Sequence, residues 1–391
     1  MPLSGVKVLD LGRFIAGPFC ALLLGDMGAD VIKIELPGRG DEIRSHGVLV
    51  NGESSYFVGM NRNKKSVTLD LRSEDGKQIF RRLVQEADVV VENFRPDVMR
   101  KLGCDYEALR RINPGIVYCG ISGFGKDGPY ALRPCFDFIA QGMSGVMSVT
   151  GLPDGVPVRM GISISDAVAA IYAAYGIALA LLARKRSGEG QEVQVSLLDG
   201  MTSLLSFQAD KYFQRGEIPG RAGNDHPVTS PYGTFKTRDG YMNIAPAGAQ
   251  MWERLTRALG REDLLRDPRF LTNDLRCQHR NVLNHIITEI TAGRSTAEWI
   301  DRLNDFGVPC GPIYDLSQVF ADPQVRHQKM VLEVEQPTGS IKTLGSPVKL
   351  SGLPAPRRGP APQLGQHTVE ILEGLGYTTE EIQSLQNRGV V

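Results

Sequence analysis

Short apolar runs alternate with helical patterns over the first third of the chain. Continuous apolar runs predict buried strands at residues 6–11, 29–35, 87–93 and 115–122. Apolar spacing between them predicts helices at residues 16–27, 77–86 and 106–112. Short apolar strands separated by helices form parallel sheets that helices cover on both faces. The pattern therefore predicts an α/β fold with a Rossmann-like parallel sheet.

A long uncharged run, residues 167–183, predicts a buried helix that ends in Arg184-Lys185-Arg186. The run is close to the minimum length for a membrane span. It is rich in Ala, however, and no second such run exists in the sequence. We therefore expect a core helix and no membrane insertion. After this helix the sequence predicts a strand and then a second helix, the helix at roughly 198–214. A linker rich in Gly, Pro, Asn and Asp follows.

The remaining sequence predicts a second domain and a return segment. Asp239-Gly240 marks a hairpin turn, and helical patterns follow at roughly 248–259, 278–292 and 295–305. Strands are predicted at 331–335 and 340–350, and a helix pair after Gly365, joined by a Pro- and Arg-rich stretch, 353–362. We expect a large domain at 1–197, a helix and linker at 198–224, a smaller α+β domain at 225–330, and a segment at 331–391 that packs on the large domain.

Composition narrows the classes of partner. With 44 acidic and 44 basic residues the net charge is zero, which favours neither nucleic acid nor an anionic membrane. The six cysteines form no CxxC pair and none has a His at zinc-ligand spacing, so no metal site is expected. Reduced cysteines, and a chain that opens directly into a strand pattern, predict a cytoplasmic protein without a signal peptide.

Familiar catalytic motifs are missing. The first strand is followed by LGRFIAGP, where a dinucleotide fingerprint would have GxGxxG, so neither a nicotinamide nor a flavin cofactor is expected. The sequence also has no GxSxG, HExxH or P-loop. Any catalytic residues must therefore be sought outside these motifs.

Asp166 stands at the start of the long uncharged helix. Backbone N–H groups and the helix dipole favour a negative charge there, which suits a carboxylate nucleophile. Asp is also a common helix N-cap, so a purely structural role is the alternative.

Several weaker candidates keep two interpretations each. Asn93-Phe94 ends a strand, where ligands bind in open α/β sheets, or simply starts a turn. His226 is either a catalytic base or a structural residue beside Pro227. A glycine-rich loop at 123–128 either approaches a ligand or is a flexible connection. The same choice, between phosphate contact and a solvated face, applies to Lys64, Lys65, Arg72, Arg95, Arg100 and Lys101.

An ordered series of short matches spans nearly the whole chain. It comprises LD at 9–10, AGP at 16–18, GADVIKIE at 28–35, GD at 40–41, NRNKK at 61–65, LD at 69–70, VENF at 91–94, NP at 113–114, GFG at 123–125, GP at 128–129, AQ at 140–141, SG at 144–145, GEGQ at 188–191, GVP at 307–309, LG at 364–365 and HT at 367–368, with Asp137 and Asp166. With these, the chain resembles the family III CoA-transferases, which include formyl-CoA transferase, carnitine CoA-transferase and α-methylacyl-CoA racemase.

The resemblance implies an architecture and a set of site residues. Two subunits of the family thread through each other, so it implies an interlocked homodimer whose linker and Pro-rich stretch wrap the partner. Asp166 falls on the family nucleophile. The implied CoA-binding positions are Phe14, Ile15, Ala16, Leu69, Arg72, Asn93, Phe94, Lys101, Arg133, Phe136 and Asp137. Formyl-CoA transferase has Gln at the position of Ile15 and a run of glycines in its small domain, and this chain has neither.

Phe136 favours the transferase branch. The racemase branch has a His immediately before the residue that matches Asp137, and Phe136 cannot carry a proton there. We expect its ring to pack against the pantetheine or acyl group, or into the core.

The resemblance thus implies a CoA-transferase that moves CoA from an acyl-CoA to a free carboxylic acid. Small acids such as succinate, oxalate or formate are expected, with an aspartyl anhydride and an aspartyl-CoA thioester as intermediates. CoA and acyl-CoA would be substrates, and no tightly bound cofactor is expected. A racemase of the same fold and a non-catalytic CoA-binding protein are the alternatives.

Overall fold

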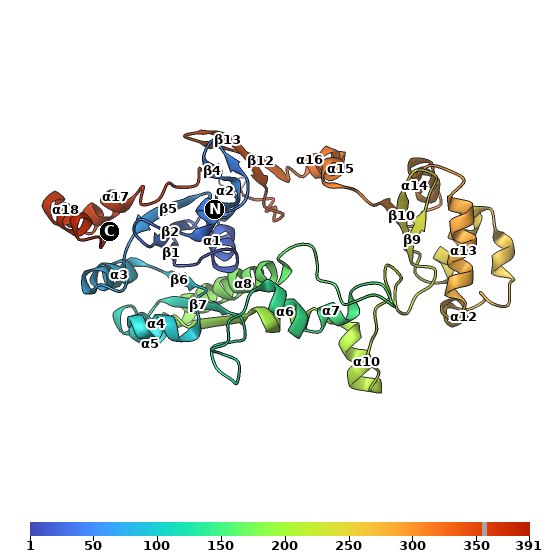
Figure 1. Ribbon diagram of the computed structural model, residues 1–391, viewed down its shortest axis with the longest axis horizontal. Coiled ribbons are helices and arrows are strands. Elements are labelled where there is room, and N and C mark those ends of the chain that lie inside the picture. Colours follow the sequence, from blue (N-terminus) through green and yellow to red (C-terminus); the bar gives the residue numbers. More distant parts are fainter. Residues whose placement is uncertain (354–357) are drawn as a thin grey trace. The chain divides into compact units, whose positions relative to one another are not determined.

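The computed structural model describes residues 1–353 and 358–391, and it divides into two compact units (Figure 1). The first unit contains Met1–Val146, Arg159–Arg215 and Pro323–Val391, and the second contains Met147–Val158 and Gly216–Asp322. Part of the Pro- and Arg-rich stretch predicted at 353–362, residues 354–357, lies outside the described residues.

The centre of the first unit is a parallel sheet. Within the described residues it has six strands in the order β5-β2-β1-β6-β7-β8. They are β1 (Lys7–Asp10), β2 (Asp30–Glu35), β5 (Lys64–Thr68), β6 (Val89–Glu92), β7 (Val117–Ser122) and β8 (Glu192–Ser196). The predicted parallel α/β sheet is thus confirmed, although strand β5 was not predicted because its sequence begins with two lysines.

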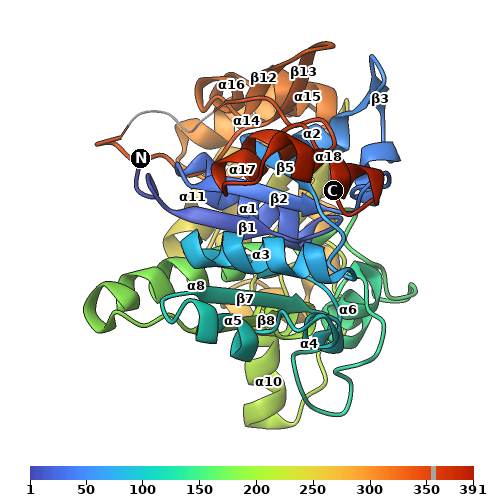
Figure 2. The ribbon, with the colours of Figure 1, turned by 90° about the vertical axis from the view of Figure 1, so that its left-hand side faces the viewer.

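Helices cover both faces of this sheet (Figure 2). On one face, α1 (Ala16–Asp26) and α8 (Ile164–Ser187) pack on the valines of β1 and β6, and small side chains such as Ala169 and Ala173 bring α8 close. The other face is covered by α3 (Glu74–Glu86), α5 (Tyr106–Ile112), α17 (Thr368–Gly374) and α18 (Thr379–Asn387). The C-terminal helices therefore complete the core of the first unit, since Leu372, Ile382 and Leu385 are buried in it.

Shorter elements surround this core. They are η1 (Glu42–Ser45), β3 (Leu49–Val50), β4 (Glu53–Ser54), α2 (Ser55–Asn61), α4 (Pro96–Leu102), α6 (Asp137–Met143), α9 (Leu197–Ser203), α10 (Phe207–Arg215), α16 (Pro323–His327), β12 (Val331–Gln336) and β13 (Gly339–Leu344). The short helix α7 (Val146–Val149) belongs to the second unit from Met147 on. The prediction of a single helix at 198–214 is wrong. The structure has two helices there, α9 and α10, because Ser206 between them has a φ of 45°, which is not helical. The strand predicted at 340–350 ends at Leu344, because its partner β12 begins at Val331, the residue that pairs with Leu344.

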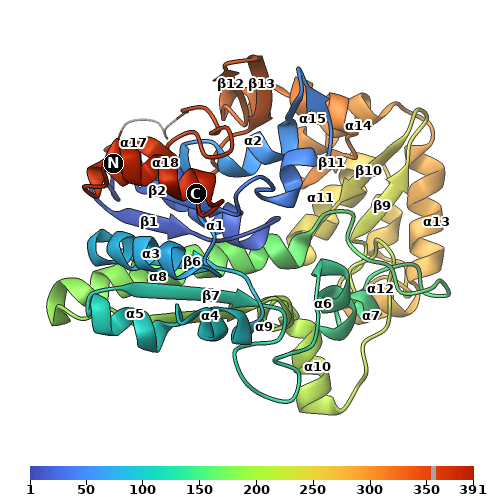
Figure 3. The same ribbon diagram turned by 60° about the vertical axis from the view of Figure 1, so that its left-hand side comes forward.

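The second unit combines a small antiparallel sheet with helices (Figure 3). The sheet order is β11-β10-β9, and the predicted hairpin at Asp239-Gly240 joins β9 to β10. Trp252, Leu283 and Trp299 are buried together in its core. The elements are β9 (Gly233–Lys236), β10 (Tyr241–Ile244), α11 (Ala249–Leu259), η2 (Glu262–Leu265), α12 (Asn273–Gln278), α13 (Arg280–Thr291), α14 (Thr296–Asp305), β11 (Cys310–Pro312) and α15 (Leu316–Ala321).

Candidate active site

Asp166 lies in the first turn of α8. The N-cap of this helix is Ser163, so the alternative that Asp166 is itself the N-cap is wrong. No described residue donates a hydrogen bond to the Asp166 carboxylate. Burial, with a smaller contribution from the negative charge of Asp137, raises the pKa of Asp166 to about 7. The Asp166 carboxylate is therefore available for a reaction, and it changes charge near neutral pH.

This pKa corrects one expectation. A helix N-terminus favours an ionised carboxylate, and from that effect alone we expected Asp166 to be held as an anion. In the structure, burial and the like charge of Asp137 outweigh the helix, so Asp166 takes up a proton more readily than a carboxyl group in water. The charge on Asp166 is thus set by packing around the helix start.

Two side chains near Asp166 were missed by the sequence analysis. Burial, and then the charge of Asp166, raise the pKa of Tyr56 on α2 to about 12. Burial and Asp166, in the same order, also raise the pKa of the Cys135 thiol. The charge of Asp166 therefore acts on both groups, and Cys135 lines the same cavity. Neither residue stands in a motif that would have indicated this position.

A cavity of about 540 Å³ contains Asp166 at the carboxyl ends of the central strands. This is the edge at which ligands bind in open α/β sheets. Eight of the eleven predicted CoA-binding residues line it together with Asp166: Phe14, Ile15, Ala16, Asn93, Phe94, Arg133, Phe136 and Asp137. Arg13, Arg95 and Cys135 are also in its wall.

The other three predicted residues do not line this cavity. Leu69 is buried in the core beneath β5. The exposed Arg72 pairs with Asp70, and the exposed Lys101 pairs with Asp97 within α4. Their contacts with CoA stay predictions.

Asn93 joins two walls of the cavity. Its amide accepts a hydrogen bond from the Arg13 N–H at 2.8 Å and donates one to the Arg13 carbonyl at 2.9 Å. Phe14 follows with a φ of 60°, a conformation that is rare for an aromatic residue. Its ring meets Phe136 edge-on at 6.1 Å between centroids. Phe136 is 69% exposed, so the alternative that it packs into the core is wrong.

Asp137 is bound into the base of α8. One of its oxygens accepts hydrogen bonds from the Ser165 N–H and hydroxyl, both at 2.9 Å. The other accepts one from the Gln141 amide at 2.8 Å. Asp137 is therefore only 8% exposed and holds the residue that precedes Asp166.

The remaining sequence candidates fall in different environments. Lys64 is fully buried and pairs with Asp10, so a phosphate contact or a solvated face is wrong for it. Gly123 lines the cavity, and in the same loop the Gly125 N–H donates to the Ser122 hydroxyl. His226 lies in the second unit, where its ring accepts a hydrogen bond from the Val228 N–H.

Three general findings complete the site. In the described part of the chain, no three or more His, Cys, Asp and Glu side chains gather where they could hold a metal ion. The six cysteines are free thiols. Among the described helices, only α8 is long and apolar enough to cross a membrane, and one face of it is buried in the core of the first unit.

An open parallel sheet with a cavity at its carboxyl edge is the arrangement of an α/β protein that binds its ligand at that edge. The sequence model of CoA-transferase family III matches residues 3–368. The chain is 40% identical over 382 residues to a succinate–glutarate CoA-transferase of Agrobacterium fabrum, covering 96% of each chain. It is 38% identical over 372 residues to an acetyl-CoA:oxalate CoA-transferase of Acetobacter aceti, covering 95% of each.

A crystal structure of a CaiB/BaiF family protein from Brucella suis is similar throughout. Its TM-score is 0.86 at 39% identity, and the match covers 96% of this chain and 99% of that one. The protein therefore belongs to CoA-transferase family III. It is a CoA-transferase, which transfers CoA between an acyl-CoA and a carboxylate. The family expected from the sequence is confirmed.

Proposed function

We propose that Asp166 is the nucleophile of the transfer. Its carboxylate attacks the thioester carbonyl of the donor and forms a mixed anhydride, and CoA leaves as a thiolate. The thiolate then attacks the aspartyl carbonyl, which releases the donor acid and leaves an aspartyl-CoA thioester. The acceptor carboxylate attacks this thioester to form a second anhydride and free the thiolate. Attack of the thiolate on the acceptor acyl carbonyl gives the new acyl-CoA and restores Asp166.

The observation that carries this proposal is the position of Asp166. It is a partly buried carboxylate in the cavity wall, and no described residue donates a hydrogen bond to it. A buried carboxylate with few hydrogen bonds is a stronger nucleophile than a solvated one. Backbone N–H groups of the loop that begins at Gly123 are candidates to stabilise the oxyanions that form during each attack. Water must be excluded, because the anhydride hydrolyses.

Chemical trapping tests the nucleophile. The enzyme is incubated with succinyl-CoA, quenched with hydroxylamine, and digested for mass spectrometry. Modification should fall on Asp166 and be absent in Asp166→Asn, while Asp154→Asn, an exposed carboxylate in the second unit, serves as the matched control. Near-normal turnover by Asp166→Ala would rule out the covalent mechanism.

We propose small dicarboxylic acids as substrates. The support comes from relatives that are similar over nearly their whole length and are named for succinate, glutarate and oxalate. The test is a matrix of acyl-CoA donors against free acids with purified protein. Highest kcat/KM for a dicarboxylate pair is expected, whereas a preference for formate or a long monocarboxylate would overturn this assignment.

We further propose that the enzyme is a cytoplasmic, interlocked homodimer, with the helix and linker at 198–224 between a large domain and a small domain. Its support within the first unit is an exposed apolar surface over α6, α8 and α10. Large exposed apolar surfaces mark protein interfaces. The surface residues are Phe138, Ile139, Met143, Ile171, Tyr175, Leu179, Leu182, Phe207, Tyr212 and Phe213. A stable and active monomer in sedimentation experiments would contradict the dimer.

A further inference from the structure

The loop between β1 and α1 is held by side chains from other parts of the first unit. Its Gly12 N–H donates to Asp10 at 2.8 Å, and both backbone groups of Arg13 are bound by Asn93. The Phe14 N–H donates to Oδ1 of Asp41 at 3.2 Å. A positive φ at an aromatic residue is unfavourable, and it persists only where the surroundings impose it. These contacts therefore keep the Phe14 ring in the cavity wall.

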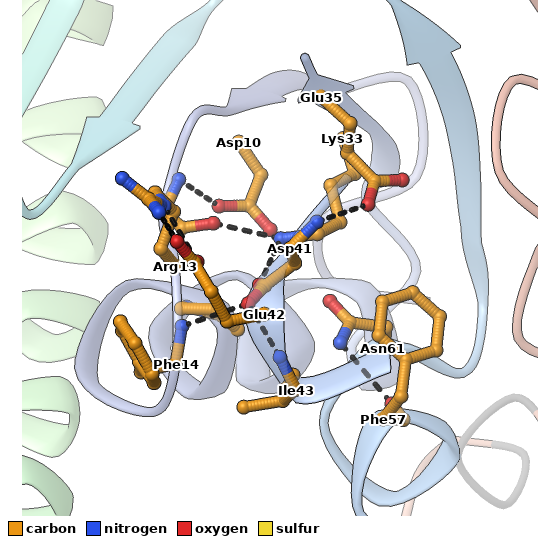
Figure 4. A network of polar contacts seen from close by, with 12 residues as sticks. Asp10, Arg13, Phe14, Lys33, Glu35, Asp41, Glu42, Ile43, Phe57 and Asn61 are labelled. Carbon is orange, nitrogen blue, oxygen red and sulfur yellow. Dashed lines mark hydrogen bonds and ion pairs between the residues drawn. The ribbon is translucent and has the colours of Figure 1, made fainter. Parts of the chain in front are cut away.

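Two buried lysines, Lys33 and Lys64, contact this loop or the residues that flank it, and Figure 4 shows Lys33 beside Asp41. The Lys33 ammonium lies 2.9 Å from Oδ2 of Asp41 and donates to the Gly12 carbonyl at 2.7 Å. The Lys64 ammonium donates to Asp10 at 2.7 Å and to the Pro18 carbonyl at 2.8 Å. The loop is thus bound to charged pairs that are closed off from water.

Lys33 and Lys64 contact different parts of the region around the loop. Lys33 contacts the loop directly at Gly12, and it compensates the carboxylate that binds the Phe14 N–H. Oδ2 of Asp41 is buried, and the Lys33 ammonium 2.9 Å away compensates its charge. Lys64 instead ties Asp10 to the first turn of α1. Of the two lysines, Lys33 is therefore the one on which the Phe14 conformation depends more directly, through Gly12 and Asp41.

We propose that Lys33 is a positioning residue for acyl-CoA binding, which acts through Gly12 and Asp41 to hold Phe14 in the cavity wall. The inference rests on the proposed function in one respect, namely that the cavity around Asp166 receives the acyl-CoA. Lys33 itself does not line that cavity. Asp166 is held separately, by α8 and Asp137. Loss of the Lys33 ammonium should therefore weaken ligand binding far more than it slows acylation of bound substrate.

The primary test compares Lys33→Met with wild type in two measurements. Free CoA binding is measured by calorimetry, and acylation of Asp166 by saturating succinyl-CoA is measured in single turnover. We expect Kd for CoA to rise about tenfold, because the strained loop is released, and the saturated acylation rate to stay within about threefold. Lys7→Met, which removes an exposed lysine of β1, is the control and should change neither quantity.

A second set of variants separates positioning from general damage. Phe14→Gly tolerates a positive φ without strain, so Lys33→Met should weaken CoA binding much less in that background than in wild type. If Lys33→Met does not fold, Asp41→Asn replaces it. Asn keeps the oxygen that accepts from Phe14 but removes the charge opposite Lys33, and it should again raise Kd and spare the saturated rate.

Two results would overturn the inference: unchanged CoA affinity in the folded variant, or the same loss of affinity with Phe14 and with Gly at position 14. Because Kd for free CoA requires no chemistry at Asp166, a failure of the aspartyl mechanism would appear only in the acylation measurement. The two proposals therefore fail independently.

Discussion

Replacing Asp166 by Asn should make the free enzyme more stable at alkaline pH. In the folded protein, burial and then Asp137 raise the pKa of Asp166 from 3.8 to about 7. The unfolded chain ionises near the lower value, so the folded state binds the proton more tightly. Between these two values stability falls as the pH rises, and above the higher value the cost is constant. Asn cannot ionise and escapes this cost.

The size of the effect follows from the shift in pKa. A change of about 3 units corresponds to about 4 kcal/mol at pH 8, or to about 2 kcal/mol after allowance for the partial exposure of the side chain. At pH 5 less than half of this cost has developed, and at pH 4 almost none has. For a chain of this length the gain at pH 8 corresponds to a rise in Tm of about 2–5 °C.

Scanning calorimetry of wild type and Asp166→Asn without CoA, at pH 5 and pH 8, measures this difference directly. Asp154→Asn removes an exposed carboxylate and should give no gain that depends on pH. The reasoning is refuted if Asp166→Asn is no more stable than wild type at pH 8, or if its gain is as large at pH 5. Either result would mean that Asp166 is solvated or paired in the free enzyme.

Four further outcomes can be checked. Acylation of Asp166 in single turnover should rise about tenfold between pH 6 and pH 8, because only the ionised carboxylate attacks; a flat profile would contradict this. Glu92→Gln should stabilise the protein by about 3 kcal/mol at most at pH 8 and not at pH 4, since burial raises the pKa of Glu92 to about 7 and Gln can still accept from the Phe94 N–H; equal gains at both pH values in denaturant titrations would argue against it. Leu179→Glu, on the exposed face of α8, should keep newly made chains from assembling into the proposed dimer, so that the variant sediments as a monomer, and a dimeric variant would argue against an interface at Leu179. A 2-methylacyl-CoA in D₂O without an acceptor acid should keep its α-proton by NMR, because Phe136 cannot carry one; rapid exchange would favour a racemase instead.

The parallel sheet could be predicted because its information is local. Apolar runs and helical spacing located strands β1, β2, β6 and β7 within a few residues. Strand β5 was missed because Lys64 begins it, and a buried lysine depends on a partner 54 positions away, Asp10. A local pattern carries no signal of such a pair.

In the candidate site, too, the features that depend on local sequence could be predicted, and those that depend on the tertiary fold could not. The position of Asp166 at a helix start was visible in the sequence, because the uncharged run that follows it is long and unbroken. Its pKa was not, since that depends on burial and on Asp137, which reaches α8 only through the tertiary fold. Tyr56 was missed for the same reason: it comes from α2, and only the tertiary fold brings it within the electrostatic influence of Asp166.

The buried carboxylates around the cavity differ in whether a cation compensates them. Asp10 and Asp41 each have a lysine ammonium within 3 Å, at 2.7 and 2.9 Å. Asp166 forms no ion pair with any described residue, although it is also largely buried. Burying an unpaired charge is costly, whereas a paired one can serve as a rigid anchor. Lysines thus compensate Asp10 and Asp41, which hold the loop before α1, whereas Asp137 is held by uncharged donors from Ser165 and Gln141. In the proposed mechanism, this difference lets the loop before α1 stay in place while the unpaired Asp166 attacks the thioester.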